Sequence, residues 1–292
     1  MQFLVYLLVY PIIWFISILP FRLLYLLSDV LYFILYYIVK YRKATVQKHL
    51  KMALPHLTEQ ERLVIEKKSY KHQCDMFLEM IKTLNISKRE MERRYVFTNL
   101  EIYKELEAQQ KSVIIMLAHY ASYEWVISMN NYINFNGYGI YKRIKNPYFD
   151  GLVKKIRSRY KTTLISTKET AQTIEDNNLK KTLGVYGFIS DQTPGSVKNS
   201  HWYRFMGIET PIHIGAEVLA KRFDMNIVFL KTKKVKRGFY EATFEILTDD
   251  ARSVPDFKIS ETFIQKVEQQ IYEAPEFYMW THKRWKHKKE VN

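Results

Sequence analysis

The sequence is poor in the residues that build disulfides, zinc sites and flexible linkers. Its single cysteine, Cys74, excludes an internal disulfide and a cysteine-based zinc site. Only 9 Gly and 8 Pro are spread through 292 residues, so we expect neither a flexible linker nor a disordered tract. No internal repeat at the period of a solenoid is present. These absences favour a folded chain in a reducing compartment.

Acidic residues are also in the minority. The chain has 45 Lys and Arg against 30 Asp and Glu, a net charge of +15, which suits nucleic acid, an anionic membrane surface or an acidic soluble partner. Its 22 Tyr, 17 Phe and 5 Trp favour a membrane interface. The basic residues form no arginine-rich helix, and zinc-finger, KH and RRM signatures are absent. We therefore expect no nucleic-acid partner.

The amino terminus is strongly apolar. Residues 1–21 carry no charge and are about long enough to span the hydrocarbon core of a bilayer. A second apolar run, residues 23–39, contains a single acid, Asp29, and is followed at once by Lys40, Arg42 and Lys43. Basic flanks of this kind lie on the cytoplasmic side. A cleavable signal peptide is not favoured, because no basic segment precedes the first run and no small-x-small cleavage site follows it.

These two runs form either a pair of buried core helices or a membrane anchor, and we favour the anchor. The predicted organisation is an anchor over residues 1–40 and one domain over residues 41–292, on the cytoplasmic side. Whether the anchor crosses once, forms a hairpin or lies flat stays open at this point.

Beyond the anchor, short apolar runs alternate with helical patterns. Apolar residues at helical spacing predict a helix over residues 58–84, opened by a capping box of Thr58 and Glu61. Strands are predicted at 113–118, 183–190, 227–230 and 240–247, and helices at 123–132, 147–160, 214–223 and 257–272. This alternation is typical of an α/β layered fold. The basic segment 231–237 is predicted to be an exposed strand or hairpin edge, and the basic tail 282–289 suits an anionic membrane surface.

Two histidines have a glutamate five positions later: His56 with Glu61, and His119 with Glu124. A carboxylate on one ring nitrogen fixes the tautomer and stabilises the imidazolium, so such a pair is suited to general-base chemistry. The spacing alone is weak, because histidines and acids are common. We interpret the first pair as chance, since Glu61 already has a role in the capping box.

The second pair has a more telling context. Residues 113–118 form a buried-strand pattern that ends directly on His119, and functional groups of α/β folds concentrate at the carboxyl ends of strands. The alternative is a core histidine capped by a nearby acid. A second buried-strand pattern, residues 183–190, ends on Asp191, Gln192 and Thr193. Two such strand ends predict a cleft with polar residues on both walls.

These motifs resemble a known family, the late acyltransferases of lipid A biosynthesis, of the lauroyl and myristoyl transferase type, within the lysophospholipid acyltransferase superfamily. The resemblance covers nearly the whole chain. The motifs that carry it are Tyr41-Arg42-Lys43, His49-Leu50, Leu54-Pro55, Glu79-Met80-Ile81-Lys82, Ala118-His119 through Glu124-Trp125, Tyr141-Lys142-Arg143 through Pro147, Arg157, Phe188 through Pro194, Thr210-Pro211, Gly215-Ala216-Glu217 and Trp280 through Lys286.

The resemblance implies a mixed sheet flanked by helices, as in glycerolipid acyltransferases, behind a membrane-anchoring helical segment. It implies that His119 is the general base and Glu124 its orienting partner. Arg157 and Asp191 match positions expected near the reacting carbonyl or a substrate phosphate, and Gln192 and Arg143 are further substrate-binding candidates.

The resemblance also implies the substrates and the cellular location. The acyl chain is expected to be donated by acyl carrier protein to a hydroxyacyl-bearing disaccharide lipid, with no metal and no cofactor. The enzyme is expected at the bacterial inner membrane, with the catalytic domain on its cytoplasmic face. Two positions depart from common patterns. His49 stands where many members have Asn, and the acid of the pair is Glu rather than the superfamily's commoner Asp.

The residues agree with direct acyl transfer, because no GxSxG elbow is present and Cys74 has no obvious base beside it. Within the enzyme class, the rival is acylation of another membrane lipid: a lysophospholipid, a glycolipid or an amino-acid lipid. From another class, the rival is a membrane-tethered basic binding protein without turnover. The segment 231–237 has the alternative of docking the acidic carrier protein. The acyl chain length and the hydroxyl acylated are not readable from the sequence.

Overall fold

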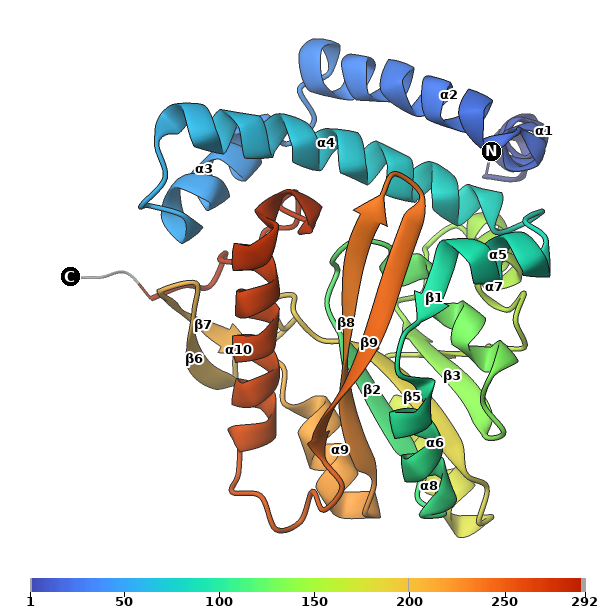
Figure 1. The fold of residues 1–292 in the computed structure, drawn as a ribbon, viewed down its shortest axis with the longest axis vertical. Helices are drawn as coiled ribbons and strands as arrows, with labels where there is room; N and C mark the ends of the chain where they lie inside the picture. Colours follow the sequence, from blue (N-terminus) through green and yellow to red (C-terminus); the bar gives the residue numbers. More distant parts are fainter. Residues whose placement is uncertain (1, 199, 290–292) are drawn as a thin grey trace.

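A computed structural model describes residues 2–198 and 200–289 of the chain, and it shows one mixed sheet with helices packed around it (Figure 1). The strands of this sheet, in spatial order, are β1 (Tyr95–Phe97), β9 (Phe239–Thr248), β8 (Asn226–Lys236), β2 (Val113–Leu117), β5 (Gly184–Ile189), β3 (Asn136–Tyr141) and β4 (Thr163–Ser166). All strand pairs are parallel except β8 with β9. The predicted α/β fold with a mixed sheet is confirmed.

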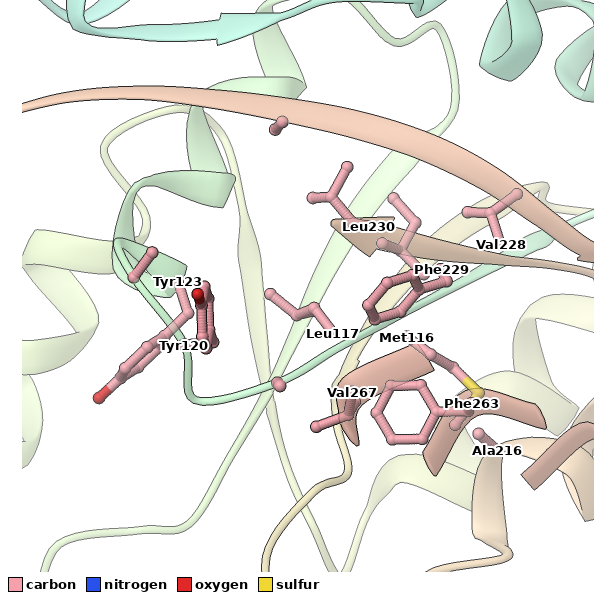
Figure 2. Close-up of a cluster of buried hydrophobic side chains, with 14 of the residues drawn as sticks. Met116, Leu117, Tyr120, Tyr123, Ala216, Val228, Phe229, Leu230, Phe263 and Val267 are labelled. Atoms are coloured by element: carbon pink, nitrogen blue, oxygen red, sulfur yellow. The ribbon is translucent and has the colours of Figure 1, made fainter. Parts of the chain in front are cut away.

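Strand β2 lies at the centre of this sheet, and all five of its side chains are buried. It is parallel to β8 on one side and to β5 on the other. Strands buried on both faces read as continuous apolar runs, which is why β2 was predictable from Val113 onward. The core on one face is visible in Figure 2, where Phe263 and Val267 of α10 and Ala216 of α9 face Met116 and Phe229 of the sheet.

The helices are numbered along the chain. They are α1 (Gln2–Ile18), α2 (Phe21–Phe33), α3 (Lys43–Ala53), α4 (Glu59–Lys82), α5 (Lys88–Arg94), α6 (Leu100–Ala108), α7 (Pro147–Arg157), α8 (Thr170–Leu179), α9 (Gly215–Phe223) and α10 (Lys258–Glu273). A π-helical turn, η1 (Ile34–Ile38), continues α2, and two 3₁₀ segments are η2 (Tyr123–Asn131) and η3 (Pro275–Phe277). A separate antiparallel pair consists of β6 (His201–Phe205) and β7 (Ile208–Ile212).

Helix α4 confirms the predicted capping box. The Thr58 hydroxyl accepts from the Glu61 backbone N–H at 3.2 Å, and the Glu61 carboxylate accepts from the Thr58 backbone N–H at 2.7 Å. The predicted helix at residues 123–132 is instead the 3₁₀ segment η2. Its β-branched and asparagine content makes it a poor α-helix former, and short 3₁₀ turns are common connectors.

Two basic segments are partly covered by other parts of the chain. Segment 231–237 forms the hairpin end of β8 and β9, as predicted, and the register of β8 with β2 stops before it, at Phe229; within it, Lys234 lies 3.5 Å from the buried Asp75 carboxylate. In the tail, Arg284 and Trp285 are 1% and 4% exposed, so the tail is not simply a membrane-facing basic surface. In both cases an aromatic ring of another segment lies against a basic side chain, Phe277 against Lys234 and Phe205 against Arg284, which no local pattern reveals.

The apolar amino terminus forms two helices that lie on α4, on the side away from the sheet (Figure 1). The stretch Phe21–Ile38, which joins α2 and η1, is long enough and apolar enough to cross a membrane by length and composition, whereas α1 is shorter. Only a small part of this stretch is buried in the protein. An apolar segment able to anchor the chain is thus present where the sequence predicted it.

Candidate active site

His119 lies two residues beyond the end of β2, and Asp191 lies two residues beyond the end of β5. Because β2 and β5 are neighbouring parallel strands, their carboxyl ends meet at the same edge of the sheet. His119 Nδ1 lies 2.8 Å from Asp191 Oδ1, and the same oxygen accepts the His119 backbone N–H at 2.9 Å. The sequence predicted this edge correctly, and the structure brings His119 and Asp191 into direct contact there.

Burial acts to raise the pKa of Asp191, which is 1% exposed. The neighbouring His119 ring and its two hydrogen bonds outweigh that effect and lower the pKa below its ordinary value. Asp191 is therefore an anion at neutral pH, and His119 Nδ1–H donates to it. This tautomer leaves Nε2 with the free lone pair, so the pair is arranged to take a proton from a bound hydroxyl and return it.

Glu124, expected to orient His119, binds another residue. Its carboxylate accepts two hydrogen bonds from the Arg157 guanidinium, from Nε at 2.8 Å and from Nη2 at 2.5 Å. Glu124 stands in the first turn of η2 and Arg157 in the last turn of α7, so the pair ties these two segments together. Burial acts to lower the pKa of Arg157, but the Glu124 charge and hydrogen bonds raise it, and the guanidinium stays charged.

Tyr123 directly precedes Glu124 in the sequence, and its ring contacts that of His119. Its ring meets the His119 ring edge-on at a centroid distance of 4.9 Å. Burial, followed by the Glu124 charge, raises its pKa, so the phenol keeps its proton. The Arg157 charge acts to lower the Tyr123 pKa, and the Asp191 charge acts to raise it.

The other two predicted substrate-binding residues are placed differently. Gln192 follows Asp191, and its side-chain amide lies 3.8 Å from the Met279 sulfur, so it belongs to the same edge. Arg143 is 60% exposed and pairs with Glu169, which directly precedes α8. The structure therefore brings Gln192 to the site and leaves Arg143 on an exposed surface.

Sequence reasoning missed the carboxy-terminal segment that encloses this edge. The Met279 backbone N–H donates to the His119 carbonyl at 3.2 Å, and the Ala121 backbone N–H donates to the Phe277 carbonyl at 3.0 Å. On the other wall, the Thr193 hydroxyl donates to the Lys283 carbonyl at 3.3 Å. The motif Trp280 through Lys286 was noted, but backbone contacts of this kind have no side-chain signature in the sequence.

A small hollow of about 10 Å³, room for about one water molecule, lies beside His119. Its walls come from α4, from the loop after β2 and from the carboxy-terminal segment. The lining residues are Ser69, His72, Gln73, Met76, His119, Ala121, Tyr123, Phe277, Tyr278 and Met279. Apolar side chains such as Met76 and Phe277 lie in this lining together with His119.

Three other buried or half-buried histidines, His72, His213 and His282, have lowered pKa values. Burial lowers the pKa of His282 to about 4 and also lowers the pKa of His213. Burial lowers the pKa of His72 well below its ordinary value as well. In the described part of the chain, no three His, Cys, Asp or Glu side chains lie together in a group that could hold a metal ion.

The α/β fold thus places a carboxylate-held histidine at the carboxyl ends of two neighbouring parallel strands. The chain belongs to the family of bacterial lipid A biosynthesis acyltransferases, which matches residues 1–287. It is thus an acyltransferase of the lipid A biosynthesis type. No curated protein matches this sequence.

Proposed function

We propose that this enzyme transfers a fatty acyl chain from an acyl thioester, carried by acyl carrier protein, to a hydroxyl of a lipid A precursor. In this proposal it acts at the cytoplasmic face of the bacterial inner membrane. Membership of the family supports the reaction class. The observation that carries the proposal is the His119–Asp191 hydrogen bond of 2.8 Å at the strand ends.

In the proposed mechanism, His119 Nε2 takes the proton of the acceptor hydroxyl as its oxygen attacks the thioester carbonyl carbon. The C–O bond forms, and the carbonyl oxygen becomes an oxyanion. The C–S bond then breaks, and the imidazolium gives its proton to the leaving thiolate. The products are an ester and a free thiol, and Asp191 stabilises the imidazolium between the two proton transfers.

The Glu124–Arg157 pair has a separate proposed role. Arg157 keeps a guanidinium beside the site, and its side chain is 26% exposed. A fixed positive charge there is suited to the developing oxyanion or to a substrate phosphate. Glu124 holds that guanidinium in place, so its contribution reaches the reaction through Arg157 and not through His119.

Direct transfer, without an acyl-enzyme, is supported by the state of the one cysteine. Cys74 is buried on α4, and burial followed by the Asp75 charge raises its pKa to about 12. A thiol of that kind is not ionised at neutral pH and is a poor nucleophile. A Ser-based elbow is likewise absent from the sequence.

The test is an assay with the purified full chain, acyl carrier protein loaded with a fatty acid, and a lipid A precursor as acceptor. The expected product is the acceptor with one added acyl ester. His119→Ala should lower turnover by about 10²–10⁴-fold, the usual contribution of a general base. Transfer to a lysophospholipid or glycolipid but not to the lipid A precursor would move the acceptor assignment while keeping the mechanism. Near-normal turnover of His119→Ala would overturn the base assignment.

A further inference from the structure

Both ends of α1 touch the body of the protein. Near its beginning, Tyr6 stacks on Tyr148 with ring centroids 5.6 Å apart, and Tyr148 lies on α7. At its end, Lys82 of α4 donates to the carbonyls of Ser17 and Leu19 at 2.9 and 2.7 Å. A helix of 17 residues is about 25 Å long. If α1 crossed a bilayer, one of these two ends would be carried to the far side of the membrane, away from the body.

Helix α2 is also held along its length and not only at one end. Leu24, near its start, is fully buried against Leu78 and Ile81 of α4. Further along, the Ser28 hydroxyl donates to Asp75 at 2.7 Å. Beyond α2, Tyr36 of η1 meets Tyr70 edge-on at 5.2 Å. Figure 1 shows α2 running lengthwise above α4.

The acid of α2 is neutralised by the body. Arg237, at the β8–β9 hairpin, donates to Asp29 from Nη1 at 3.1 Å and from Nη2 at 2.7 Å. The same guanidinium donates to the buried Asp75 at 2.6 and 3.0 Å, and Lys71 lies 3.2 Å from Asp29. We call Arg237, Asp29 and Asp75 the polar clamp. An acid at the centre of a bilayer is costly, whereas here it is paired with two cations of the body.

The outward faces of both helices are apolar. Large hydrophobic side chains that stay exposed there are Leu4, Leu8, Ile12, Phe15, Leu26 and Phe33. Exposed basic residues, Arg22 and Lys40, stand near the two ends of the α2–η1 stretch. Apolar side chains bordered by basic ones fit one leaflet of an anionic membrane, with the helices parallel to its surface.

From these contacts we infer that α1 and α2 lie in the plane of a single leaflet and that neither crosses the membrane. The polar clamp and the Lys82 contacts hold them against α4. Helix α4 then separates the lipid from the hollow beside His119, because its other face lines that hollow. The active site would lie about one helix diameter, roughly 10 Å, from the membrane surface, within reach of a lipid held in that leaflet. This inference rests on the proposed membrane association.

Two positions, each changed to cysteine in its own variant, distinguish the possible membrane topologies of α1 and α2. Gln2→Cys reports the start of α1, and Arg22→Cys reports the turn between α1 and α2. Lys180→Cys, just after α8, reports the side on which the body lies. Each full-length variant is labelled with a membrane-impermeant maleimide in right-side-out and in inverted membrane vesicles. The native Cys74 is buried and serves as the unlabelled background.

The in-plane arrangement predicts that Gln2→Cys and Arg22→Cys are labelled only from the side that labels Lys180→Cys. If α1 alone crosses, Gln2→Cys is labelled from the opposite side. If α2 alone crosses, both Gln2→Cys and Arg22→Cys are labelled from the opposite side. If both helices cross, only Arg22→Cys is labelled from the opposite side. Any of these three results overturns the in-plane arrangement while leaving membrane association intact. Recovery of the protein in the soluble fraction, alone or as a dimer through these apolar faces, would instead overturn membrane association itself.

Discussion

At the residue scale, one carboxylate oxygen of Asp191 accepts two hydrogen bonds from His119, one from the backbone and one from the ring. The partner suggested by sequence spacing, Glu124, is engaged by Arg157. Spacing along the chain reveals local pairs only, whereas the contact with Asp191 depends on β2 and β5 being neighbours in the sheet. The sequence was therefore able to locate His119 and Asp191 at strand ends but not to pair them.

Replacing Asp191 by Asn tests the orienting role. The amide offers an N–H to the ring where the carboxylate offered only acceptors, so it favours the wrong tautomer and no longer stabilises the imidazolium. We expect Asp191→Asn to lower kcat by about 10²–10⁴-fold with little change in KM. The measurement is steady-state kinetics with both substrates varied, and Asp176→Asn, an exposed change on α8, is the matched control. An unchanged kcat would remove Asp191 from the mechanism.

Glu124 and Arg157 should behave as one unit. Because each holds the other, losing either one disrupts the placement of the guanidinium. In a double-mutant cycle on kcat/KM, Glu124→Gln with Arg157→Gln should be about as impaired as the worse single variant. If the losses in kcat/KM of the two single variants instead multiply in the double variant, and a second cycle shows Glu124 coupled to His119, the pairing of Glu124 with His119 suggested by sequence spacing would be favoured.

At the element scale, helices and strands could be predicted from the sequence where neighbouring residues form a clear pattern. Strand β2 was predicted from a continuous apolar run, and helix α4 from a capping box and the helical spacing of its apolar residues. Strand β3 was missed because two glycines and an asparagine interrupt its apolar pattern, and β4 is only four residues long. The β6–β7 pair was missed for a similar reason, since its outward side chains are a mixture of aromatic and charged residues.

Helix α4 also carries a titrating group in its interior. Burial raises the pKa of Glu79 from 4.5 to about 7, against opposing hydrogen bonds from Tyr25 and Tyr240. Between these two pH values the folded chain keeps a proton on Glu79 that the unfolded chain has released. The contribution of Glu79 to the free energy of unfolding is therefore largest below about pH 4.5 and declines as the pH rises towards 7.

Glu79→Gln should abolish that decline. The expected result is that the unfolding free energy of the wild-type protein falls from about pH 4.5 to about pH 7 relative to that of the variant, and that the two change in parallel outside this window. Denaturant unfolding in detergent at several pH values measures it. Two curves that stay parallel throughout would show that Glu79 does not titrate in this range.

At the scale of the whole molecule, three layers follow from the outside inwards: the apolar helices α1 and α2, the long helix α4, and the sheet whose strand ends carry His119 and Asp191. Composition alone predicted an anchor and a basic, aromatic-rich chain. It did not predict how the anchor docks, because the polar clamp joins residues from α2, α4 and the β8–β9 hairpin. Contacts between such distant segments depend on the tertiary fold.

Removing Arg237 should loosen this arrangement. Arg237→Met leaves Asp29 and Asp75 without their shared cation, and Asp75 is only 2% exposed. Loss of one partner of a buried pair costs about 3–5 kcal/mol, and about half of that is expected here because Arg237 is 30% exposed. The readout is thermal unfolding together with protease cleavage between α2 and α3. Arg93→Met, at an exposed arginine whose ion pair is with Glu90 of the same helix, is the control.

The most direct test of the central claim is mass spectrometry of the total lipids of the host with the gene intact, deleted, and replaced by the His119→Ala variant. Acyl transfer to lipid A by a histidine base predicts that lipid A loses the same single acyl chain in both altered strains. Lipids that are identical in all three strains would contradict the proposed acylation and the role of His119 together.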